Sequence, residues 1–254
     1  MEIRVLGCSG GIGGSARTTS FVIDQDILID AGTGAADLPL EALAAIDHVF
    51  LTHSHLDHIA TLPLMLDTVG PLRHKPVTVY VQEKTLDILK HHVFNWKVWP
   101  DFSVIPDKKN PYMVYEVMDP GTEKLINNRR IRSIPVTHTV PAVGYMVSNG
   151  IGSFAFSGDT TVTEAFWDVL NEAENLKYLV METTFPDEQL ELSRLSQHLC
   201  PSLLASELTK LKSRPELFIT HLMAGQEQQV MDQINAHLKD FHAQALTHEH
   251  CFQV

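Results

Sequence analysis

A short histidine-rich segment is the first feature of the chain that could carry out chemistry. Four residues that can bind metal ions occur within six positions: His53, His55, Asp57 and His58. They follow the apolar residues 49–51, which we expect to form a buried strand. Where a loop leaves a strand, residues two apart can point the same way, so we expect His53 and His55 to share one metal ion. Asp57 and His58 would then face a second metal ion about 3.5–4 Å away.

The types of these side chains limit the choice of metal. Imidazole and carboxylate groups together suit Zn, Mn or Fe better than Ca or Mg, so we expect two divalent metal ions, with zinc as the first choice. The alternative is a solvated polar loop that is rich in histidine by chance. A loop that follows a buried strand has no physical need of this composition, and we therefore favour metal binding.

Three further candidate ligands occur later in the chain, each just after an apolar, strand-like segment: His138, Asp159 and His221. The ligands of a site built from loops collect at such strand ends. A lone histidine at a strand end is more often a structural residue. Three such cases in a chain that also has a four-ligand segment favour one shared metal site.

The elements that must position these residues follow from the hydrophobic pattern. Each half of the chain begins with segments typical of antiparallel strands and continues with alternating strands and helices, which fits two sheets with helices outside. Apolar runs predict strands at 3–6, 21–23, 27–29, 49–51, 77–81, 131–136, 143–147, 153–156, 178–181 and 217–220. Helices are expected at 38–45, 82–92, 162–173, 201–211 and 230–238, and an irregular insertion at about 94–120.

The composition bounds the class of protein. With 254 residues, 44% of them hydrophobic, the chain can bury a full core, and a single domain over residues 1–254 is expected. The first residues lack the pattern of a signal peptide, and no apolar run reaches the roughly 18 residues of a membrane span. We therefore expect a cytoplasmic protein without membrane contact. Three cysteines without a C-x-x-C pair argue against a disulfide framework. The oligomeric state stays open, a homodimer included.

The candidate ligands together resemble the metallo-β-lactamase superfamily, whose members carry H-x-H-x-D-H followed by His, Asp and His after later strands. The resemblance covers nearly the whole chain, and the segments 6–11 (LGCSGG) and 28–32 (LIDAG) match the opening strands of that family. It implies an αββα sandwich, an α/β fold of four layers. It also implies the ligands of each metal ion: His53, His55 and His138 for one, Asp57, His58 and His221 for the other, and Asp159 as a bridge.

Downstream motifs resemble the phosphodiesterase branch of this superfamily. The segment 138–145 (HTVPAVGY) is similar to the H-x-x-x-x-x-G-Y of ribonuclease Z and of class II cyclic-nucleotide phosphodiesterases. The segment 94–100 (FNWKVWP) resembles a stretch of the cyclic-nucleotide enzymes. The segment 198–201 (HLCP) is also nearer to those enzymes, although Gln197 and Cys200 replace the glycine and threonine of their G-H-L-T-P-like sequence.

The resemblance implies a metal-dependent phosphodiesterase that hydrolyses 3′,5′-cyclic nucleotides such as cAMP or cGMP. A hydroxide held between the two metal ions would attack phosphorus, and Asp57 would both bind metal and orient the hydroxide. Glu182 and His198 resemble an acid–histidine pair, in which His198 would protonate the leaving 3′-alkoxide. Taken singly, Glu182 also fits a surface carboxylate, and His198 an exposed helix cap. Asp30 is either the partner of a ligand imidazole or a turn residue.

Other functions fit the same motif. A ribonuclease Z-like tRNA 3′-endonuclease would take an RNA substrate, but it should carry a basic, glycine-rich arm, and this chain has no such arm and a net charge of −12. An esterase or lactamase-type hydrolase would act on a neutral substrate. A metal-holding binding module would not require the pair Glu182 and His198. Trp96 and Trp99 fit core packing and base stacking equally well.

Overall fold

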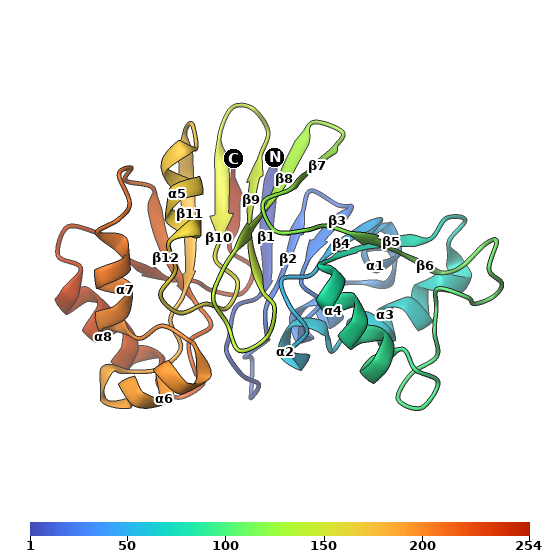
Figure 1. Ribbon diagram of the computed structural model, residues 1–254, viewed down its shortest axis with the longest axis horizontal. Helices are drawn as coiled ribbons and strands as arrows, with labels where there is room; N and C mark the ends of the chain where they lie inside the picture. The colour runs from blue at the N-terminus through green and yellow to red at the C-terminus, as the bar shows by residue number, and fades with distance from the viewer.

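The computed structural model describes residues 1–254 and is built on two mixed β-sheets of seven strands each (Figure 1). The first sheet has the order β14 (Cys251–Gln253), β1 (Glu2–Gly7), β2 (Ser20–Ile23), β3 (Ile27–Ile29), β4 (His48–Phe50), β5 (Val77–Val81) and β6 (Met113–Val117). The second sheet has the order β13 (Gln244–Ala245), β12 (Glu216–Thr220), β11 (Leu176–Glu182), β10 (Ser153–Phe156), β9 (Val143–Ser148), β8 (Arg129–Pro135) and β7 (Glu123–Ile126).

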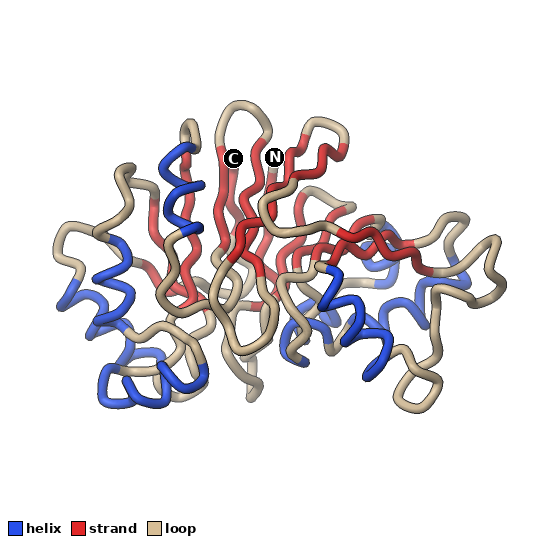
Figure 2. Tube along the Cα trace, viewed as in Figure 1, coloured by secondary structure: helices blue, strands red, loops and turns tan.

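Helices cover the outer face of each sheet, so that the strands lie in the middle of the molecule (Figure 2). The helices against the first sheet are α1 (Leu40–Ala45), α3 (Leu62–Val69) and α4 (Glu83–Ile88). Those against the second sheet are α5 (Ala165–Glu172), α7 (Pro201–Leu208) and α8 (Glu227–His237). Two short helices, α2 (Leu56–Ile59) and α6 (Leu190–Ser196), lie at the lower end of the view in Figure 1. The expected αββα sandwich is confirmed.

Three hydrophobic clusters hold these four layers together. The middle cluster joins the facing sides of the two sheets, and the outer two join each sheet to its helices. In β4, Val49 lies in the cluster that contains α3, whereas Phe50 lies between the sheets and stacks on Tyr80 with 4.2 Å between ring centroids. Because side chains alternate along a strand, the unbroken apolar run 49–51 is the pattern of a strand buried on both faces.

Strand direction changes once within each sheet. Strands β1 to β3 are antiparallel neighbours, and β3 to β6 are parallel. In the second sheet, β7 to β10 are antiparallel and β10 to β13 are parallel. This is the order predicted from the hydrophobic pattern. As a result, β8, β10, β11 and β12 end at the same edge of their sheet, and β3 and β4 end at the same edge of theirs. Loops that follow these strands can therefore build one site.

Some elements differ from the predictions. Strand β6 lies within the stretch 94–120 that was expected to be irregular, whereas residues 94–112 contain no helix or strand. The expected helix 82–92 is α-helical only to Ile88 and continues as a π-helix over Leu89–Val93. The edge strands β7, β13 and β14 were not predicted, because each is short and has exposed residues that break the apolar pattern.

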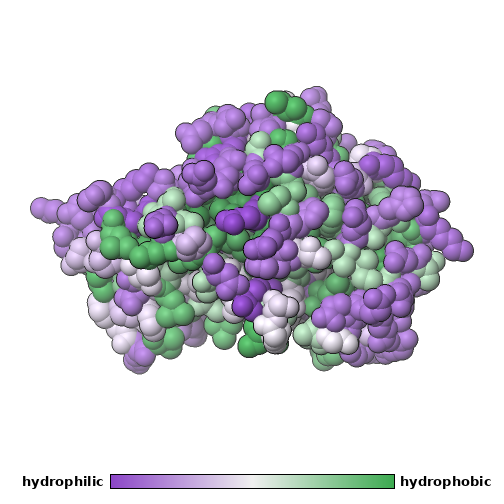
Figure 3. Space-filling view, turned by 180° about the vertical axis from the view of Figure 1, so that it is seen from behind, coloured by the Kyte–Doolittle hydropathy of each residue, from purple (hydrophilic) through white to green (hydrophobic).

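The surface shows no extended apolar belt on the face drawn in Figure 3, where hydrophilic and hydrophobic side chains are interspersed. No helix combines the length and the apolar character that crossing a membrane requires.

Candidate metal centre

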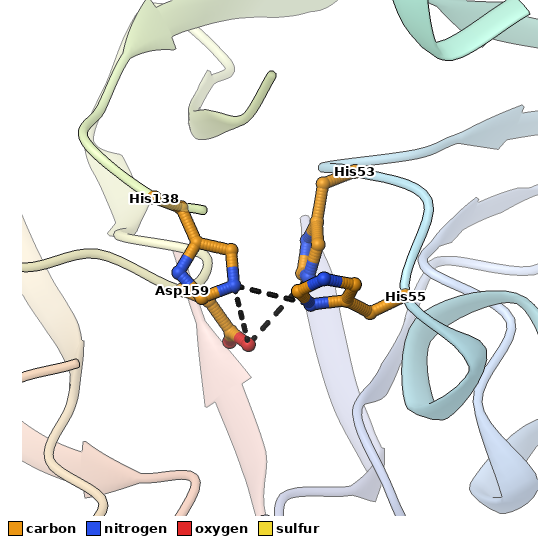
Figure 4. Close-up of side chains that lie close together, drawn as sticks. All are labelled: His53, His55, His138 and Asp159. Atoms are coloured by element: carbon orange, nitrogen blue, oxygen red, sulfur yellow. Dashed lines mark hydrogen bonds and ion pairs between the residues drawn. The ribbon is translucent and has the colours of Figure 1, made fainter. Parts of the chain in front are cut away.

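The seven candidate ligands lie together in two groups. One group contains His53, His55, His138 and Asp159, and the other contains Asp57, His58, Asp159 and His221. Within each group the possible ligand atoms all lie within 4.8 Å of one another. In Figure 4, His138 and Asp159 approach from one side and His53 and His55 from the other. Asp159 is the one residue common to both groups, which is the arrangement that the family resemblance implies.

The site lies where the two sheets meet. His53 and His55 follow β4, and Asp57 and His58 lie in α2, so these four ligands come from the first sheet. The other three come from the second sheet, each directly or shortly after a strand end: His138 after β8, Asp159 after β10 and His221 after β12. Holding these ligands in place therefore also holds the two sheets together at this edge.

The backbone is strained at several positions of the site, Asp30 and His221 among them. Asp30 has φ +55° and His221 has φ +62°, in the left-handed region that residues with a side chain rarely adopt. Such strain persists only where the surrounding contacts fix the conformation, and it is typical of functional sites. The strain at Asp30 turns its carboxylate towards the residues that follow β4.

Asp30 and Thr52 fix two of the ligands from the first sheet. The fully buried carboxylate of Asp30 accepts hydrogen bonds from the main-chain N–H of Thr52 (2.8 Å), from the Thr52 hydroxyl (2.8 Å) and from Nδ1 of His58 (2.7 Å). Because the only hydroxyl proton of Thr52 goes to Asp30, its oxygen accepts the Nδ1 proton of His53 at 2.9 Å. In their neutral form, both imidazoles therefore keep their proton on Nδ1 and leave Nε2 as the nitrogen that can bind a metal ion.

The atoms left without partners fit bound metal ions. Nε2 of His53, Nε2 of His58 and Oδ1 of Asp159 are buried and have no hydrogen-bond partner. Burying such atoms without a partner is costly, and native proteins rarely do so. Two imidazole nitrogens and a carboxylate oxygen that face one another are the donor set of a divalent transition metal. The cluster is thus able to bind metal ions.

In the second sheet, Glu182 is the buried carboxylate that corresponds to Asp30 in the first. It is fully buried at the end of β11, and its Oε1 accepts hydrogen bonds from the main-chain N–H of Thr160 (3.0 Å) and from Nδ1 of His198 (2.8 Å). Its Oε2 accepts the hydroxyl of Thr184 (3.2 Å) and the main-chain N–H of Leu199 (3.3 Å). This carboxylate is a buried acceptor of four hydrogen bonds, so the alternative of a surface carboxylate is wrong.

His198 lies beside both ligand groups. Its ring is stacked on His221, with 5.1 Å between centroids and an angle of 20°, and lies 4.9 Å from the ring of His138. The side chain is only 12% exposed, and the residue that caps α7 is Cys200, so the alternative of an exposed helix cap is also wrong. Burial opposes protonation, but the adjacent Glu182 outweighs it and raises the pKa of His198 to about 9. In the metal-free protein His198 is therefore held in its protonated form at neutral pH.

The protonation of the histidines differs between the two groups. Burial lowers the pKa of His53 well below its usual value and also lowers those of His55 and His138. These imidazoles are therefore neutral, the form that binds a metal ion. Burial also opposes protonation of His58, but nearby carboxylates, Asp159 first, outweigh it and raise the pKa of His58 well above its usual value. A proton on His58 thus occupies the place where a cation would balance these carboxylates.

The two carboxylates of the second group are ionised. Burial acts to raise the pKa of Asp57, but the hydrogen bond from His221 and the charge of His58 lower it to about 2. Asp159 is more deeply buried, yet His221 and His58 hold its pKa well below the usual range. Two negative charges beside two imidazoles make this group a place of strong attraction for a divalent cation.

Several residues that shape the site were not predicted from the sequence. They are Thr52, Thr160, Thr184 and Gln197, whose main-chain carbonyl accepts the Nδ1 proton of His138 at 3.1 Å. The only signal available was their position beside a candidate ligand or beside Glu182. Of the two tryptophans in the irregular segment, Trp99 packs against the core of the first sheet, whereas Trp96 is 64% exposed.

Comparison with known proteins defines the class. Residues 25–242 match the family described as the beta-lactamase superfamily domain. The chain therefore belongs to the metallo-β-lactamase superfamily, and it is a hydrolase of that fold.

Relatives of the chain include proteins named cyclic-nucleotide phosphodiesterase and proteins named ribonuclease Z or tRNase Z. The chain is 26% identical to a probable 3′,5′-cyclic-nucleotide phosphodiesterase of Yersinia pestis, over 83% of this chain and 72% of that protein. It is also 26% identical to tRNase Z TRZ1 of Arabidopsis thaliana, over 68% of this chain and 71% of that protein. Alignments with ribonuclease Z of Methanococcus maripaludis span only 31% of that protein. The crystal structure of unliganded yeast PDE1 superposes with a TM-score of 0.82 over 100% of this chain and 99% of that one, at 18% identity, which shows a shared fold.

Proposed function

We propose that this protein is a metal-dependent phosphodiesterase that hydrolyses 3′,5′-cyclic nucleotides. The observation that carries the proposal is the pair Glu182 and His198, which places a protonated imidazole directly beside the two ligand groups. A site that only stores metal has no need of such a pair. An alkoxide leaving group, by contrast, must receive a proton as its bond to phosphorus breaks.

The seven side chains would hold two divalent cations, zinc in the first instance, with manganese or iron as alternatives. Such ions polarise phosphoryl oxygens and lower the pKa of bound water from about 15.7 towards 7. Asp57 is 30% exposed, so besides binding metal it can accept a hydrogen bond from an attacking water and orient it. When metal is bound, His53 and His58 would contribute the lone pair of Nε2, because Thr52 and Asp30 hold the other ring proton on Nδ1.

His198 would act as the general acid. Its Nδ1 proton is bound to Glu182, and the raised pKa keeps the second ring proton on Nε2 at neutral pH. This Nε2 proton would pass to the 3′ oxygen of the nucleotide as the P–O3′ bond breaks, which leaves a 5′-monophosphate. Glu182 then stabilises the ring in the orientation needed for the transfer.

A ribonuclease Z-like activity on precursor tRNA is the second candidate, because tRNase Z TRZ1 aligns over a similar share of the chain. The net charge of −12 is unfavourable for a polyanion that contacts many residues, whereas a cyclic nucleotide needs only the site itself. We therefore rank the cyclic nucleotide first.

The test is a hydrolysis assay on the purified protein after reconstitution with zinc or manganese. We expect cAMP or cGMP to yield the 5′-monophosphate. Bis(p-nitrophenyl) phosphate reports general diesterase activity, and a precursor tRNA reports the second candidate. Cleavage of the tRNA without turnover of either cyclic nucleotide would reverse the ranking. Turnover of carboxyl esters or β-lactams with no activity on any diester would reject both.

A further inference from the structure

The hydroxyl of Thr184 lies between a candidate metal ligand and the buried Glu182. Its oxygen is 2.9 Å from Nδ1 of His221, 3.2 Å from Oε2 of Glu182 and 3.2 Å from Nδ1 of His198. Thr184 itself is buried, with 1% of its surface exposed. It lies two residues after the end of β11 and does not belong to either ligand group.

Counting protons fixes the direction of these hydrogen bonds. A hydroxyl has one proton to donate and two lone pairs that accept. Both oxygens of Glu182 already accept main-chain N–H groups, so this carboxylate acts as an acceptor and takes the Thr184 proton. Thr184 can then only accept from His221, which must carry its own proton on Nδ1.

The opposite nitrogen of His221, Nε2, is thereby the one that would bind a metal ion, in place of the proton that it shares with Asp57 in the metal-free protein. Nε2 points to Oδ2 of Asp57 (3.1 Å) and to Oδ2 of Asp159 (3.3 Å), the two carboxylates of the second ligand group. If the ring carried its proton on Nε2 instead, it could not bind a metal ion there. The position of one proton, set by Thr184, decides whether His221 can be a ligand.

The ring of His221 is also confined on its other side. The main-chain N–H of His221 donates to the carbonyl of Cys8 at 2.8 Å, and the residue is held at φ +62°. At Gly10, an added Cβ would lie 2.9 Å from Nδ1 of His221, so the glycine is needed for this close approach. With main chain on one side and Thr184 on the other, the ring has little freedom to turn away.

We propose that Thr184 is a positioning residue that sets the tautomer and orientation of His221 for metal binding in the second ligand group. Through Thr184, Glu182 supports metal binding as well as the orientation of His198. The inference rests on the proposed metal centre but is independent of the substrate, because it concerns the affinity for metal.

Zinc binding to the metal-free protein tests this role directly. Thr184→Val keeps the shape and removes the hydroxyl, and Thr184→Ser keeps the hydroxyl and removes a methyl group. Thr183→Val is the matched control, since the neighbouring Thr183 is equally buried and its hydroxyl donates only to the main-chain carbonyl of Glu182 (2.7 Å). Calorimetric titration with zinc measures both binding steps in each variant.

We expect Thr184→Val to weaken one of the two zinc-binding steps by roughly 10–100-fold and to leave the other step unchanged. Thr184→Ser should bind both ions with affinities close to those of the unaltered protein, and so should Thr183→Val. Thermal unfolding of the metal-free proteins shows whether the variants are folded. If Thr184→Val does not fold, Thr184→Ala takes its place in the same comparison with Thr184→Ser.

Two results would overturn the inference. One is a hydroxyl-free variant at Thr184 that binds two zinc ions as tightly as the unaltered protein. The other is a loss in Thr184→Ser as large as in Thr184→Val, which would show that shape matters and not the hydroxyl. If the unaltered protein itself bound no zinc, the proposed metal centre would fail, and that outcome is distinct from both.

Discussion

The two halves of the molecule support the candidate metal centre in parallel ways. Each supplies one fully buried carboxylate at or just after the end of a strand, Asp30 after β3 and Glu182 in β11. Each carboxylate accepts the hydroxyl of a threonine, Thr52 or Thr184, and each threonine in turn accepts the Nδ1 proton of a candidate ligand. The same hydrogen-bond chain therefore occurs once in each sheet.

The halves differ in the second histidine that each carboxylate holds. Asp30 accepts directly from His58, which is a candidate ligand, whereas Glu182 accepts directly from His198, which belongs to neither ligand group. The buried carboxylate of the first half thus holds candidate metal ligands only. The buried carboxylate of the second half holds one candidate ligand, through Thr184, and the proposed proton donor His198. Under the proposed function, the first sheet therefore only anchors the metal ions, whereas the second also supplies the proton donor.

Asp159→Asn should have the largest effect, because this residue is the one shared by both ligand groups. Removing its charge should weaken the binding of both metal ions and lower turnover by on the order of 10³-fold or more. Metal content after dialysis and hydrolysis of the cyclic nucleotide measure the two effects. The control is Asp168→Asn on α5, an exposed aspartate of the same half. Retention of two metal ions by Asp159→Asn would disprove that it connects the groups.

His198→Ala separates proton transfer from metal binding. We expect turnover to fall by roughly 10²–10⁴-fold, because the leaving oxygen loses its proton donor, while the metal content stays at two ions per chain. His237→Ala, which alters a partly exposed histidine paired with Asp187 on the outer side of the second sheet, should change neither quantity. Loss of metal from His198→Ala would show that His198 is a ligand or a structural residue and would remove the contrast between the halves.

The sequence predicted the layers and the positions of the candidate ligands because both depend on local patterns. The apolar runs in β4, β10 and β12 mark buried strands, and a polar ligand-type residue directly after a buried strand is conspicuous. Asp30 was left between two alternatives, and the structure favours the first: its carboxylate accepts the Nδ1 proton of His58, and it lies directly after β3 and not in a turn.

The threonines could not be predicted, because a buried threonine has no pattern of its own in the sequence. Thr52 reaches Asp30 across 22 residues, and Thr184 reaches His221 across 37. Only the pairing of distant strands brings these groups together. The strand β6 was missed for a related reason, since an edge strand is partly exposed and mixes polar with apolar residues.

Asp30→Asn and Glu182→Gln compare the two carboxylates directly. Asp30 supports His53 through Thr52 and His58 directly, one ligand in each group, so Asp30→Asn should weaken both zinc-binding steps by roughly 10–100-fold. Glu182→Gln should weaken only one step, and its turnover should fall more than its metal occupancy does. Calorimetry and turnover at saturating zinc measure this. Equal losses in both steps for both variants would contradict the division of roles.

The smallest effect is expected at the opposite end of the sandwich, where Arg129 joins the halves without any ligand. This buried residue opens β8 and donates to Asp26 at 2.7 Å and to Asp24 at 3.1 Å, both in the turn between β2 and β3. Since its partners are partly exposed, Arg129→Met should lower the free energy of unfolding by about 1–2 kcal/mol at neutral pH. Arg130→Met, at the exposed neighbour that pairs with Glu123, is the control.

The pH dependence of this loss identifies the ion pair as its cause. The hydrogen bond from Arg129 lowers the pKa of Asp26 below its ordinary value of 3.8 in the folded protein. The unfolded chain therefore binds a proton at higher pH than the folded one, so the stabilisation is complete above about pH 5 and is lost as the pH falls through the lowered pKa. Urea unfolding with a chelator present should show the gap between the unaltered protein and Arg129→Met narrowing from pH 5 to pH 3. A gap that stayed constant would assign the contribution of Arg129 to packing of its side chain between the sheets, and the far end would then be held by burial, in contrast to the charges that converge at the metal centre.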